Sequence, residues 1–309
     1  IDDEWERFVR ESFNGTIFHS LKFLNYHPQG KFDFLNLALK DRGELLCLLP
    51  GARDKERRAF VSPVGASFGG FIFREKSSKL MIECMRRLTS WLFENRFDVI
   101  AIAPEPVCYR RQADESVEFA LAEAGYTECL WDATQVVEID AFTGDRIDPV
   151  LRRNLRKAEK SGVTVGETAD VASFYRILLK NLETKGVTPT HSEEEINVLR
   201  SFFPDSVRIL GAFVDAKMVG GCLILVCNQT AALTFYICDD PDWRHLRTTD
   251  AVLAKAIELA GQLGCRYLDL GTVSKNGVVN WGLLRFKSKF GKLTFLRRRY
   301  RRKRKDANN

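Results

Sequence analysis

An internal repeat constrains the fold of this chain more than any other feature of its sequence. Residues 34–49 are apolar on both sides of Asp41-Arg42-Gly43, which is the pattern of a β-hairpin. Residues 209–226 repeat this pattern around Asp215-Ala216-Lys217, at an offset of 174 positions. Two hairpins so far apart indicate that the chain is a duplication of one structural plan.

The segments that follow each hairpin repeat in the same order. Each hairpin is followed by a helix with a core-facing stripe, then a short strand, then a second helix that ends near a glycine. The offset between the paired segments drifts from 174 to 166, as expected if loops were shortened after a duplication. The paired segments are the helices at 79–94 and 249–263, the strands at 97–103 and 267–270, and the glycines Gly125 and Gly291.

The repeat predicts an α/β fold with two mixed sheets, each flanked by helices. A length of 309 residues suits two domains, and 45% hydrophobic with 28% charged residues excludes a disordered chain or a coiled coil. We expect an N-terminal domain at 1–145, a C-terminal domain at 146–296 and a basic tail at 297–309. Two tandem sheets leave a cleft between them, which is a common place for a binding site.

The net charge of +6 comes from the C-terminal end. Eight of the nine residues from Arg297 to Lys305 are basic, whereas residues 1–296 contain 39 Lys and Arg against 40 Asp and Glu. Such a tail favours polyanions, so RNA and the inner face of an anionic membrane are candidate partners. A solvated end that only improves solubility is the alternative.

Cysteine and histidine usage argues against a metal centre. The eight cysteines form no C-x-x-C pair and the chain has four histidines, so we expect no metal site and reduced thiols, as in the cytoplasm. Residues 218–238 carry no charge and are long enough to cross a bilayer. The polar turn Asn228-Gln229-Thr230 favours two buried strands instead.

Five segments, in this order and spacing, resemble the FemABX aminoacyltransferases and their acetyltransferase-like relatives, which have two tandem GNAT-like domains. They are FHSLKFLN at 18–25, PVGASFGGF at 63–71, RRNLRKAEKSGV at 152–163, GCRYLDLG at 264–271 and GLLRFKSKFG at 282–291. The resemblance implies an acyltransferase that transfers an acyl or aminoacyl group to an amine, commonly on a cell-envelope or polysaccharide precursor. It implies an acceptor bound in the cleft between the domains.

The last segment contains the candidate catalytic residues. Attack of an amine on an ester or thioester carbonyl creates an oxyanion, which needs a cation or hydrogen-bond donors. The resemblance implies that Lys287 stabilises this oxyanion and that Phe286 packs on the donor. Lysines that only solvate a helix are the alternative. Asp269 is a second candidate, as acceptor of the amine proton, although such an aspartate more often holds a neighbouring loop.

Other residues are candidates for binding the substrates. The basic helix that begins at residue 149 carries Arg153, Arg156 and Lys157, which suit phosphates of an acceptor or of tRNA, although an ordinary surface helix also explains them. The resemblance adds Lys22 from the first half. It also adds Gly69-Gly70, which would let an acceptor approach the backbone or would form a tight turn. His191 and His245 receive no role.

The donor stays open between acyl-CoA and aminoacyl-tRNA, and we expect no permanently bound cofactor. Residues 243–249, where acetyltransferases of this superfamily carry a glycine-rich pyrophosphate loop, contain no glycine. Arg244 and Arg247 are the candidate donor-phosphate contacts there. The alternative to an enzyme is a non-catalytic duplicate that binds RNA or anionic membrane through the basic tail.

Overall fold

The computed structural model describes residues 2–304, which form two compact units. Unit 1 contains the residues up to Ala133, the short segment Lys275–Val278 and the residues from Phe295 onwards. Unit 2 contains Thr134–Ser274 and Val279–Thr294. Unit 2 therefore begins at Thr134, whereas the predicted domain boundary lies after residue 145.

Unit 1 has a three-stranded sheet of order β1-β2-β5 and a share of a larger sheet, with the order β3-β4-β6-β15-β7. Helices α3 and α4 pack on one face of the larger sheet, around Phe60, Ile100 and Tyr300. The elements are α1 (Asp2–Glu11), η1 (Ile17–His19), α2 (Leu21–Leu24), β1 (Leu37–Asp41), β2 (Glu44–Leu49), β3 (Ala52–Asp54), β4 (Ala59–Ser62), β5 (Ile72–Phe73), α3 (Ser78–Glu94), β6 (Val99–Ile102), η2 (Val107–Tyr109), α4 (Ser116–Glu123), β7 (Thr127–Glu138) and β15 (Leu293–Lys303).

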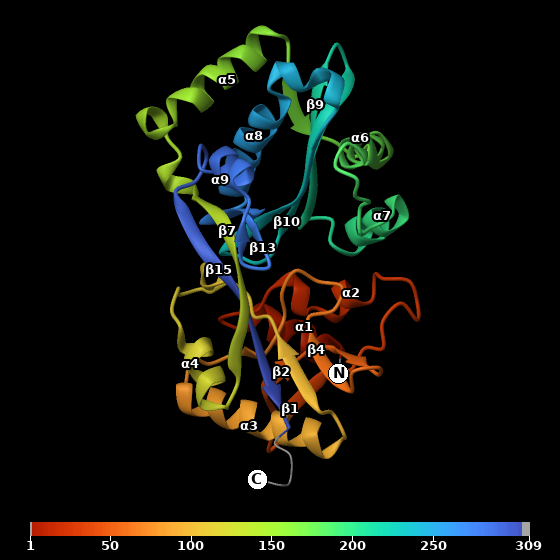
Figure 1. The fold of residues 1–309 in the computed structure, drawn as a ribbon, viewed down its shortest axis with the longest axis vertical. Coiled ribbons are helices and arrows are strands. Elements are labelled where there is room, and N and C mark those ends of the chain that lie inside the picture. Colours follow the sequence, from red (N-terminus) through yellow and green to blue (C-terminus); the bar gives the residue numbers. More distant parts are fainter. Residues whose placement is uncertain (1, 305–309) are drawn as a thin grey trace. The chain divides into compact units, whose positions relative to one another are not determined.

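Unit 2 continues from β7 with the order β7-β12-β11-β10-β9-β8. Helices α6 and α7 lie on one side of β9 and β10, and α5 and α8 lie on the other (Figure 1). The elements are η3 (Ile139–Ala141), η4 (Gly144–Arg146), α5 (Pro149–Lys160), β8 (Thr164–Glu167), α6 (Val171–Glu183), α7 (Glu193–Phe202), β9 (Val207–Val214), β10 (Lys217–Val226), β11 (Ala231–Asp239), η5 (Pro241–Leu246), α8 (Thr248–Gln262), β12 (Tyr267–Thr272), β13 (Ser274–Lys275), β14 (Val278–Val279) and α9 (Trp281–Lys287).

The predicted repeat is present. The hairpins are β1–β2 and β9–β10, the following helices are α3 and α8, and the following strands are β6 and β12. The uncharged segment at 218–238 forms β10 and β11 with a turn between them. The two hairpins differ in one respect, because β1–β2 belongs to the separate small sheet whereas β9–β10 belongs to the large one.

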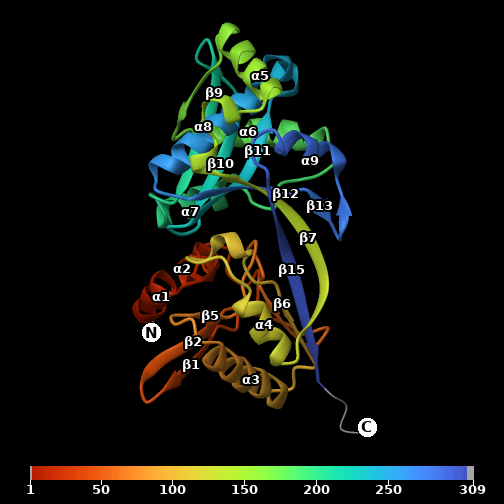
Figure 2. The same cartoon turned by 90° about the vertical axis from the view of Figure 1, so that its left-hand side faces the viewer.

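The basic end of the chain corrects the prediction of a tail at 297–309. Residues up to Lys303 belong to β15, which pairs with β6 and lies beside β7 in the sheet (Figure 2). This segment forms a strand because alternate side chains can pack inside unit 1. Tyr300 is buried, and Arg302, two residues further on, packs over the rings of Phe93 and Tyr126. Residues 305–309 of the predicted tail lie outside the described residues.

Residues 2–304 contain neither a candidate membrane span nor a cluster of potential metal ligands. None of the helices there combines the length and the hydropathy needed to cross a bilayer. No group of three potential metal ligands comes together in the same range. Seven of the eight cysteines are buried free thiols, and Cys129 is exposed.

Candidate active site

In unit 2, two parallel strands part and create a site between them. Strand β11 pairs with β12 from Ala231↔Tyr267 to Leu233↔Asp269, where the parallel pairing ends. Beyond that point β11 stays paired with β10, with an irregularity at Phe235 in their register. Both strands continue past the last pair, which leaves an unpaired region, the gap, between their ends.

Lys287 reaches this gap from the last residue of α9. Its side chain is buried, and its ammonium donates a hydrogen bond to the carbonyl oxygen of Thr272 at 2.9 Å. The same nitrogen lies 3.4 Å from the place where a Cβ on Gly271 would be. A buried ammonium at the end of a parted strand pair is suited to stabilise a developing negative charge.

Asp269 lies two residues before Gly271 on β12, and its carboxylate is engaged in hydrogen bonds. Its carboxylate is fully buried, accepts a hydrogen bond from the hydroxyl of Thr134 and accepts another from the amide of Gly271 at 2.7 Å. These bonds hold the left-handed turn at Gly271, where φ is +84°. The geometry therefore favours the alternative interpretation, a loop-holding aspartate, over a proton acceptor.

Phe286 is half-buried and packs against the core of unit 2. Its ring lies 5.6 Å from that of Phe290, and the ammonium of Lys289 lies 4.5 Å above its centroid. Lys289 also pairs with the buried carboxylate of Asp250 on α8. Two of the basic residues of this segment are thus engaged within unit 2, so the segment is not simply a solvated surface.

A cluster that the sequence analysis missed lies on the other strand of the parted pair. The hydroxyl of Tyr236 lies 2.7 Å from Nδ1 of His191 and 2.8 Å from the hydroxyl of Thr190. His191 is buried, and its carbonyl oxygen accepts a hydrogen bond from the hydroxyl of Tyr175 on α6 at 3.1 Å. Burial raises the pKa of Tyr236, so its hydroxyl keeps its proton at neutral pH.

Tyr236 and the carbonyl that Lys287 binds both lie past the last β11–β12 pair. Tyr236 is three residues beyond Leu233 on β11, and Thr272 is three residues beyond Asp269 on β12. No sequence signal joins His191 to Tyr236, since 45 positions separate them and only the fold brings them together.

The start of α8 differs from a phosphate-binding loop. Arg247 precedes the helix with φ of +67°, a conformation that usually belongs to glycine. The carboxylate of Asp239 lies close to this helix start, where it accepts from the hydroxyl of Thr249 at 3.2 Å and from Nε and Nη2 of Arg244 at 2.9–3.2 Å. Arg244 is therefore neutralised by Asp239, whereas the side chain of Arg247 is exposed.

Helix α5 presents its predicted basic residues to solvent. Arg153, Arg156 and Lys157 are exposed, and none of them forms an ion pair within residues 2–304. Arg156 lines a groove of about 790 Å³ whose floor is apolar side chains of α5 and α8. Arg153 and Lys157 are four residues apart and so share a face of the helix. The structure brings these three cations together on one helix.

The predicted residues of unit 1 lie at two places. Lys22 is exposed on α2. Gly69 and Gly70 are buried, and a Cβ on either would come within 2.9 Å of a side chain, that of Ser62 or of Ile102. Gly70 also has φ of +100°. Both positions are therefore closely packed inside unit 1, and the contact of these glycines with an acceptor stays a prediction.

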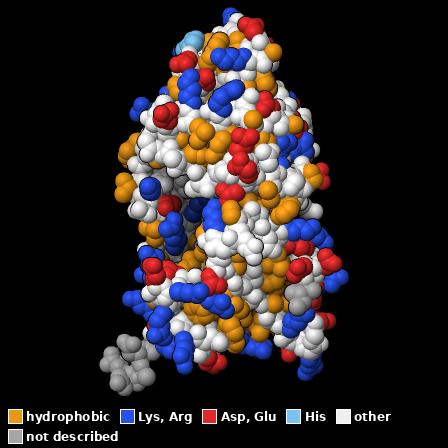
Figure 3. Space-filling model, turned by 90° about the vertical axis from the view of Figure 1, so that its right-hand side faces the viewer, with side chains coloured by type: hydrophobic (Ala, Val, Ile, Leu, Met, Phe, Trp, Pro, Cys, Tyr) orange, Lys and Arg blue, Asp and Glu red, His pale blue; other side chains and the backbone are white. Residues whose placement is uncertain are grey.

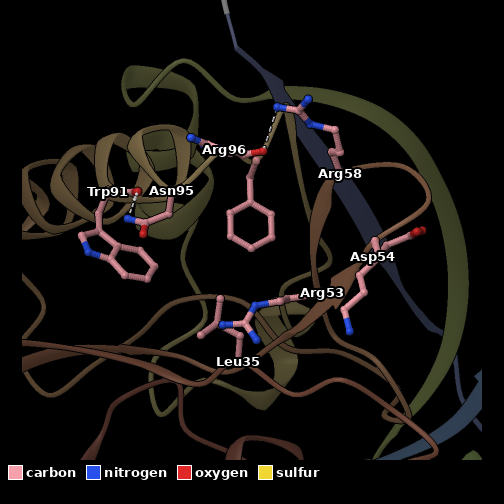
Figure 4. A pocket seen from close by; sticks show the side chains of 9 residues that line it. Leu35, Arg53, Asp54, Arg58, Trp91, Asn95 and Arg96 are labelled. Carbon is pink, nitrogen blue, oxygen red and sulfur yellow. Dashed lines mark hydrogen bonds between the residues drawn. The ribbon is translucent and has the colours of Figure 1, made fainter.

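Charges of both signs cover the surface. Figure 3 shows acidic and basic side chains interleaved with apolar ones over the face that it draws, as the balance of charges in residues 1–296 predicts. A cavity of about 350 Å³ in unit 1 is rich in cations, and Figure 4 shows Arg53, Arg58 and Arg96 around it. Arg53 pairs with Asp33 and Arg58 with Asp98, so most of its charge is balanced internally.

With this geometry established, comparison with known proteins identifies the fold. Residues 149–288 match the family described as an acetyltransferase (GNAT) domain, and this segment contains the parted strands, α8 and Lys287. This segment of the chain is thus similar to a GNAT acetyltransferase domain. No curated protein sequence matches the chain.

Solved structures extend the fold to the whole chain. FemX is similar over 97% of this chain and 95% of its own, with a TM-score of 0.74 at 12% identity. The C-terminal domain of a putative lysylphosphatidylglycerol synthetase from Agrobacterium fabrum is similar over 97% and 90%, with a TM-score of 0.63 at 12% identity. A tandem GNAT protein from the clavulanic acid biosynthesis pathway is similar over 91% and 86%, with a TM-score of 0.51 at 11% identity.

The chain therefore has the tandem GNAT fold of the FemABX type. The resemblance predicted from the sequence motifs is confirmed at the level of fold, as is the mixed α/β class.

Proposed function

We propose that the chain transfers an aminoacyl group from a tRNA ester to an amine on a cell-envelope precursor and so forms an amide. One observation carries this proposal: the buried ammonium of Lys287 at the point where β11 and β12 part. A carbonyl bound in this gap would place its oxygen near a cation in a site of low dielectric constant, where the charge interaction is strong.

The residues around the gap account for each part of the reaction. The amine attacks the ester carbon, the new C–N bond forms, and Lys287 stabilises the oxyanion until the C–O bond of the donor breaks. With the proton of His191 on Nε2, its Nδ1 accepts from the hydroxyl of Tyr236. Tyr236 can then accept a proton from the amine while its own proton passes to His191. The proton gained by His191 then passes through water to the departing ribose oxygen, so the amine loses one proton and the ribose hydroxyl gains it.

The start of α8 supports tRNA over coenzyme A as the donor. A pyrophosphate needs free amides and a positive field at a helix N-terminus, but here Asp239 places a carboxylate beside that position and neutralises Arg244. The exposed cations of α5 and Arg247 supply the attraction that a polynucleotide backbone requires. Arg153, Arg156 and Lys157 are thus proposed phosphate contacts.

The acceptor is proposed from the names of proteins with the same fold. FemX and the putative lysylphosphatidylglycerol synthetase both have this fold, and the second is named for a product that combines lysine with a phospholipid. An amine-bearing precursor of the envelope is therefore the acceptor class we favour for this chain.

The proposal is tested by transfer of a radioactive label. Purified protein is mixed with amine-bearing envelope precursors and either a mixture of labelled aminoacyl-tRNAs or labelled acetyl-CoA. We expect labelled amide only with aminoacyl-tRNA, and a loss of about 10²- to 10³-fold in kcat for Lys287→Ala. The matched control is Lys292→Ala, an exposed lysine five residues further on. Transfer from acetyl-CoA would overturn the choice of donor, and full activity of Lys287→Ala would overturn the mechanism.

A further inference from the structure

Strand β15 sorts the basic residues at the end of the chain into two sets. Arg298 forms ion pairs with Glu115 at 3.1 Å and with Glu128 at 3.2 Å, and Arg302 donates to the carbonyl oxygen of Ala124 at the end of α4. These residues face α3 and α4. Because side chains alternate along a strand, Arg299, Arg301 and Lys303 point to the opposite face.

The second set has no internal counter-charge. Arg299, Arg301 and Lys303 are exposed, and within residues 2–304 none of them forms an ion pair. They are spaced by two residues, which is about 6.8 Å along a strand. In unit 1, α3 and α4 lie on the other side of β15 and β7, as Figure 2 shows. Folding therefore uses one half of the basic run and leaves the other half available to solvent.

Small uncharged residues surround these cations. Arg301 pairs in register with Ala101, which pairs in turn with Val61, and Cys129 on β7 lies against the backbone of Arg299. With the loop after β4 they enclose a cavity of about 400 Å³. Apart from Arg299 and Arg301, the residues that line this cavity are uncharged, so it offers a ligand two cations and no competing carboxylate.

The loop after β4 adds hydrogen-bond donors to the cavity. Ser67 and Ala66 line it, and neither the hydroxyl of Ser67 nor the amide of either residue forms a hydrogen bond in the part of the chain that the structure describes. Backbone amides in a folded protein are normally paired with protein, water or a ligand. Guanidinium groups, a hydroxyl and backbone amides are the donor set that a phosphate group prefers.

We propose that this cavity in unit 1 binds a phosphate group, held by Arg299 and Arg301 and by the hydroxyl of Ser67. The volume suits a small phosphorylated group rather than a folded polymer. The group belongs either to a soluble phosphate compound or to the headgroup of an anionic lipid, which share this chemistry. The site is separate from the residues of the proposed acyl transfer, so either proposal can fail without the other.

The test measures binding of two probes at low ionic strength. Inorganic pyrophosphate is titrated by calorimetry, and phosphatidylglycerol vesicles are compared with phosphatidylcholine vesicles by co-sedimentation. The double variant Arg299→Ala/Arg301→Ala removes two cations from the cavity. The matched control, Lys79→Ala/Arg87→Ala, removes two exposed cations from α3 on the other face of unit 1.

A soluble ligand predicts that pyrophosphate binds at one site per chain and that the double variant weakens binding about tenfold or more, with the control unchanged. A lipid headgroup as ligand predicts that phosphatidylglycerol vesicles bind, that pyrophosphate and phosphatidylcholine vesicles do not, and that the double variant weakens binding while the control does not. Equal weakening by both double variants, or no binding of either probe, would overturn the proposal. Binding of RNA alone would also overturn the proposal, because it would show general attraction of a polyanion to exposed cations and no phosphate site in the cavity.

A second variant covers the case in which the double variant folds poorly. Ser67→Ala removes one donor and no charge, and we expect it to weaken pyrophosphate or headgroup binding about threefold to tenfold. Circular dichroism checks that each variant keeps the secondary structure of the unaltered protein. Unchanged binding in Ser67→Ala together with unchanged binding in the double variant would contradict the assignment.

Discussion

The two units follow one plan and differ where their central parallel strands end. In unit 1, β4 pairs with β6 up to Ser62↔Ile102, and the bonding then continues: the amide of Ala103 donates to Ser62 O, and the amide of Gly69 donates to Ala103 O. In unit 2 the corresponding pair, β11 and β12, parts after Leu233↔Asp269. The same arrangement of strands is closed in one unit and open in the other.

The buried charges next to these strand ends differ in the same way. In unit 1, the fully buried guanidinium of Arg110 is bonded to Glu105 at 2.8 Å and to Glu118 of α4 at 2.7 Å. In unit 2, Lys287 of α9 donates to a backbone carbonyl. The guanidinium of unit 1 is thus paired with carboxylates inside the fold. The comparison supports the proposal that unit 2 carries the acyl-transfer chemistry.

The largest expected difference between the units is a fall in the free energy of unfolding in acid, which originates from a buried histidine in unit 1. Burial lowers the pKa of His19 to about 4, because the charged imidazolium would lose its hydration inside the core. The unfolded chain, with a usual histidine pKa near 6.5, binds the proton more readily. Stability contributed by neutral His19 is therefore complete at pH 7 and is lost as the pH falls towards 4, by about 3 kcal/mol.

Urea unfolding at pH 7 and at pH 4 measures this effect. His19→Asn keeps an acceptor for Thr16 and cannot titrate, so the free energy of unfolding should depend less on pH by about 3 kcal/mol. His245→Asn, at an exposed position, is the control. The assignment is wrong if His19→Asn shows the same pH dependence as the unaltered protein.

The next effect concerns the proton path proposed for unit 2. Tyr236→Phe removes the hydroxyl that bonds His191, and we expect kcat to fall about 100-fold, since general acid–base catalysis typically contributes at least that much. Tyr175→Phe is the control, because its hydroxyl bonds only the backbone of His191. Steady-state transfer rates decide the question, and equal rates for both variants would remove Tyr236 from the mechanism.

A smaller effect tests the closure of unit 1. The buried hydroxyl of Ser62 donates to Pro50 O and accepts from the amide of Gly70 at 2.8 Å, so Ser62→Ala leaves two buried groups without a partner. We expect a loss of about 2 kcal/mol in the free energy of unfolding and no change in kcat. Ser78→Ala, at an exposed position on α3, should change neither quantity. A fall in kcat for Ser62→Ala would mean that the packing of unit 1 also affects the transfer reaction.

Local patterns predicted most elements of the fold, because hairpins, amphipathic helices and buried strands are determined by neighbouring residues. The helix from residue 149, the two hairpins and the strand at 267–270 all follow from periodicity and turn residues. The strand β15 does not follow from periodicity, because basic residues on both of its faces hide the alternation of buried and exposed side chains. Only the burial of Tyr300 and the partners of Arg298 and Arg302 reveal it.

The candidate site was only partly predictable for a related reason. Lys287 followed from the resemblance of its segment to a known family, and the structure buries its side chain; its role stays a proposal. The bond between His191 and Tyr236 depends on how far β11 extends past β12, which no local pattern contains. The ion pair of Arg244 with Asp239 was not predictable either, because it forms only when η5 folds Arg244 back towards the end of β11.

The smallest expected effect separates the position of Lys287 from the stability of the turn that adjoins it. Gly271→Ala places a methyl group 3.4 Å from the ammonium of Lys287, at a residue with φ of +84°. We expect a loss of about 1 kcal/mol in the free energy of unfolding from the strained backbone. Displacement of the ammonium should also lower kcat about fivefold.

Gly264→Ala provides the matched control, because Gly264 has φ of +80° and its added Cβ would meet nothing within 4 Å. Both variants should lose similar stability in urea, and only Gly271→Ala should lose activity. If the two variants had the same kcat, the ammonium of Lys287 could be shifted without consequence. Its proximity to Gly271 would then be a feature of packing, and the open strand pair of unit 2 would need another cation for the oxyanion.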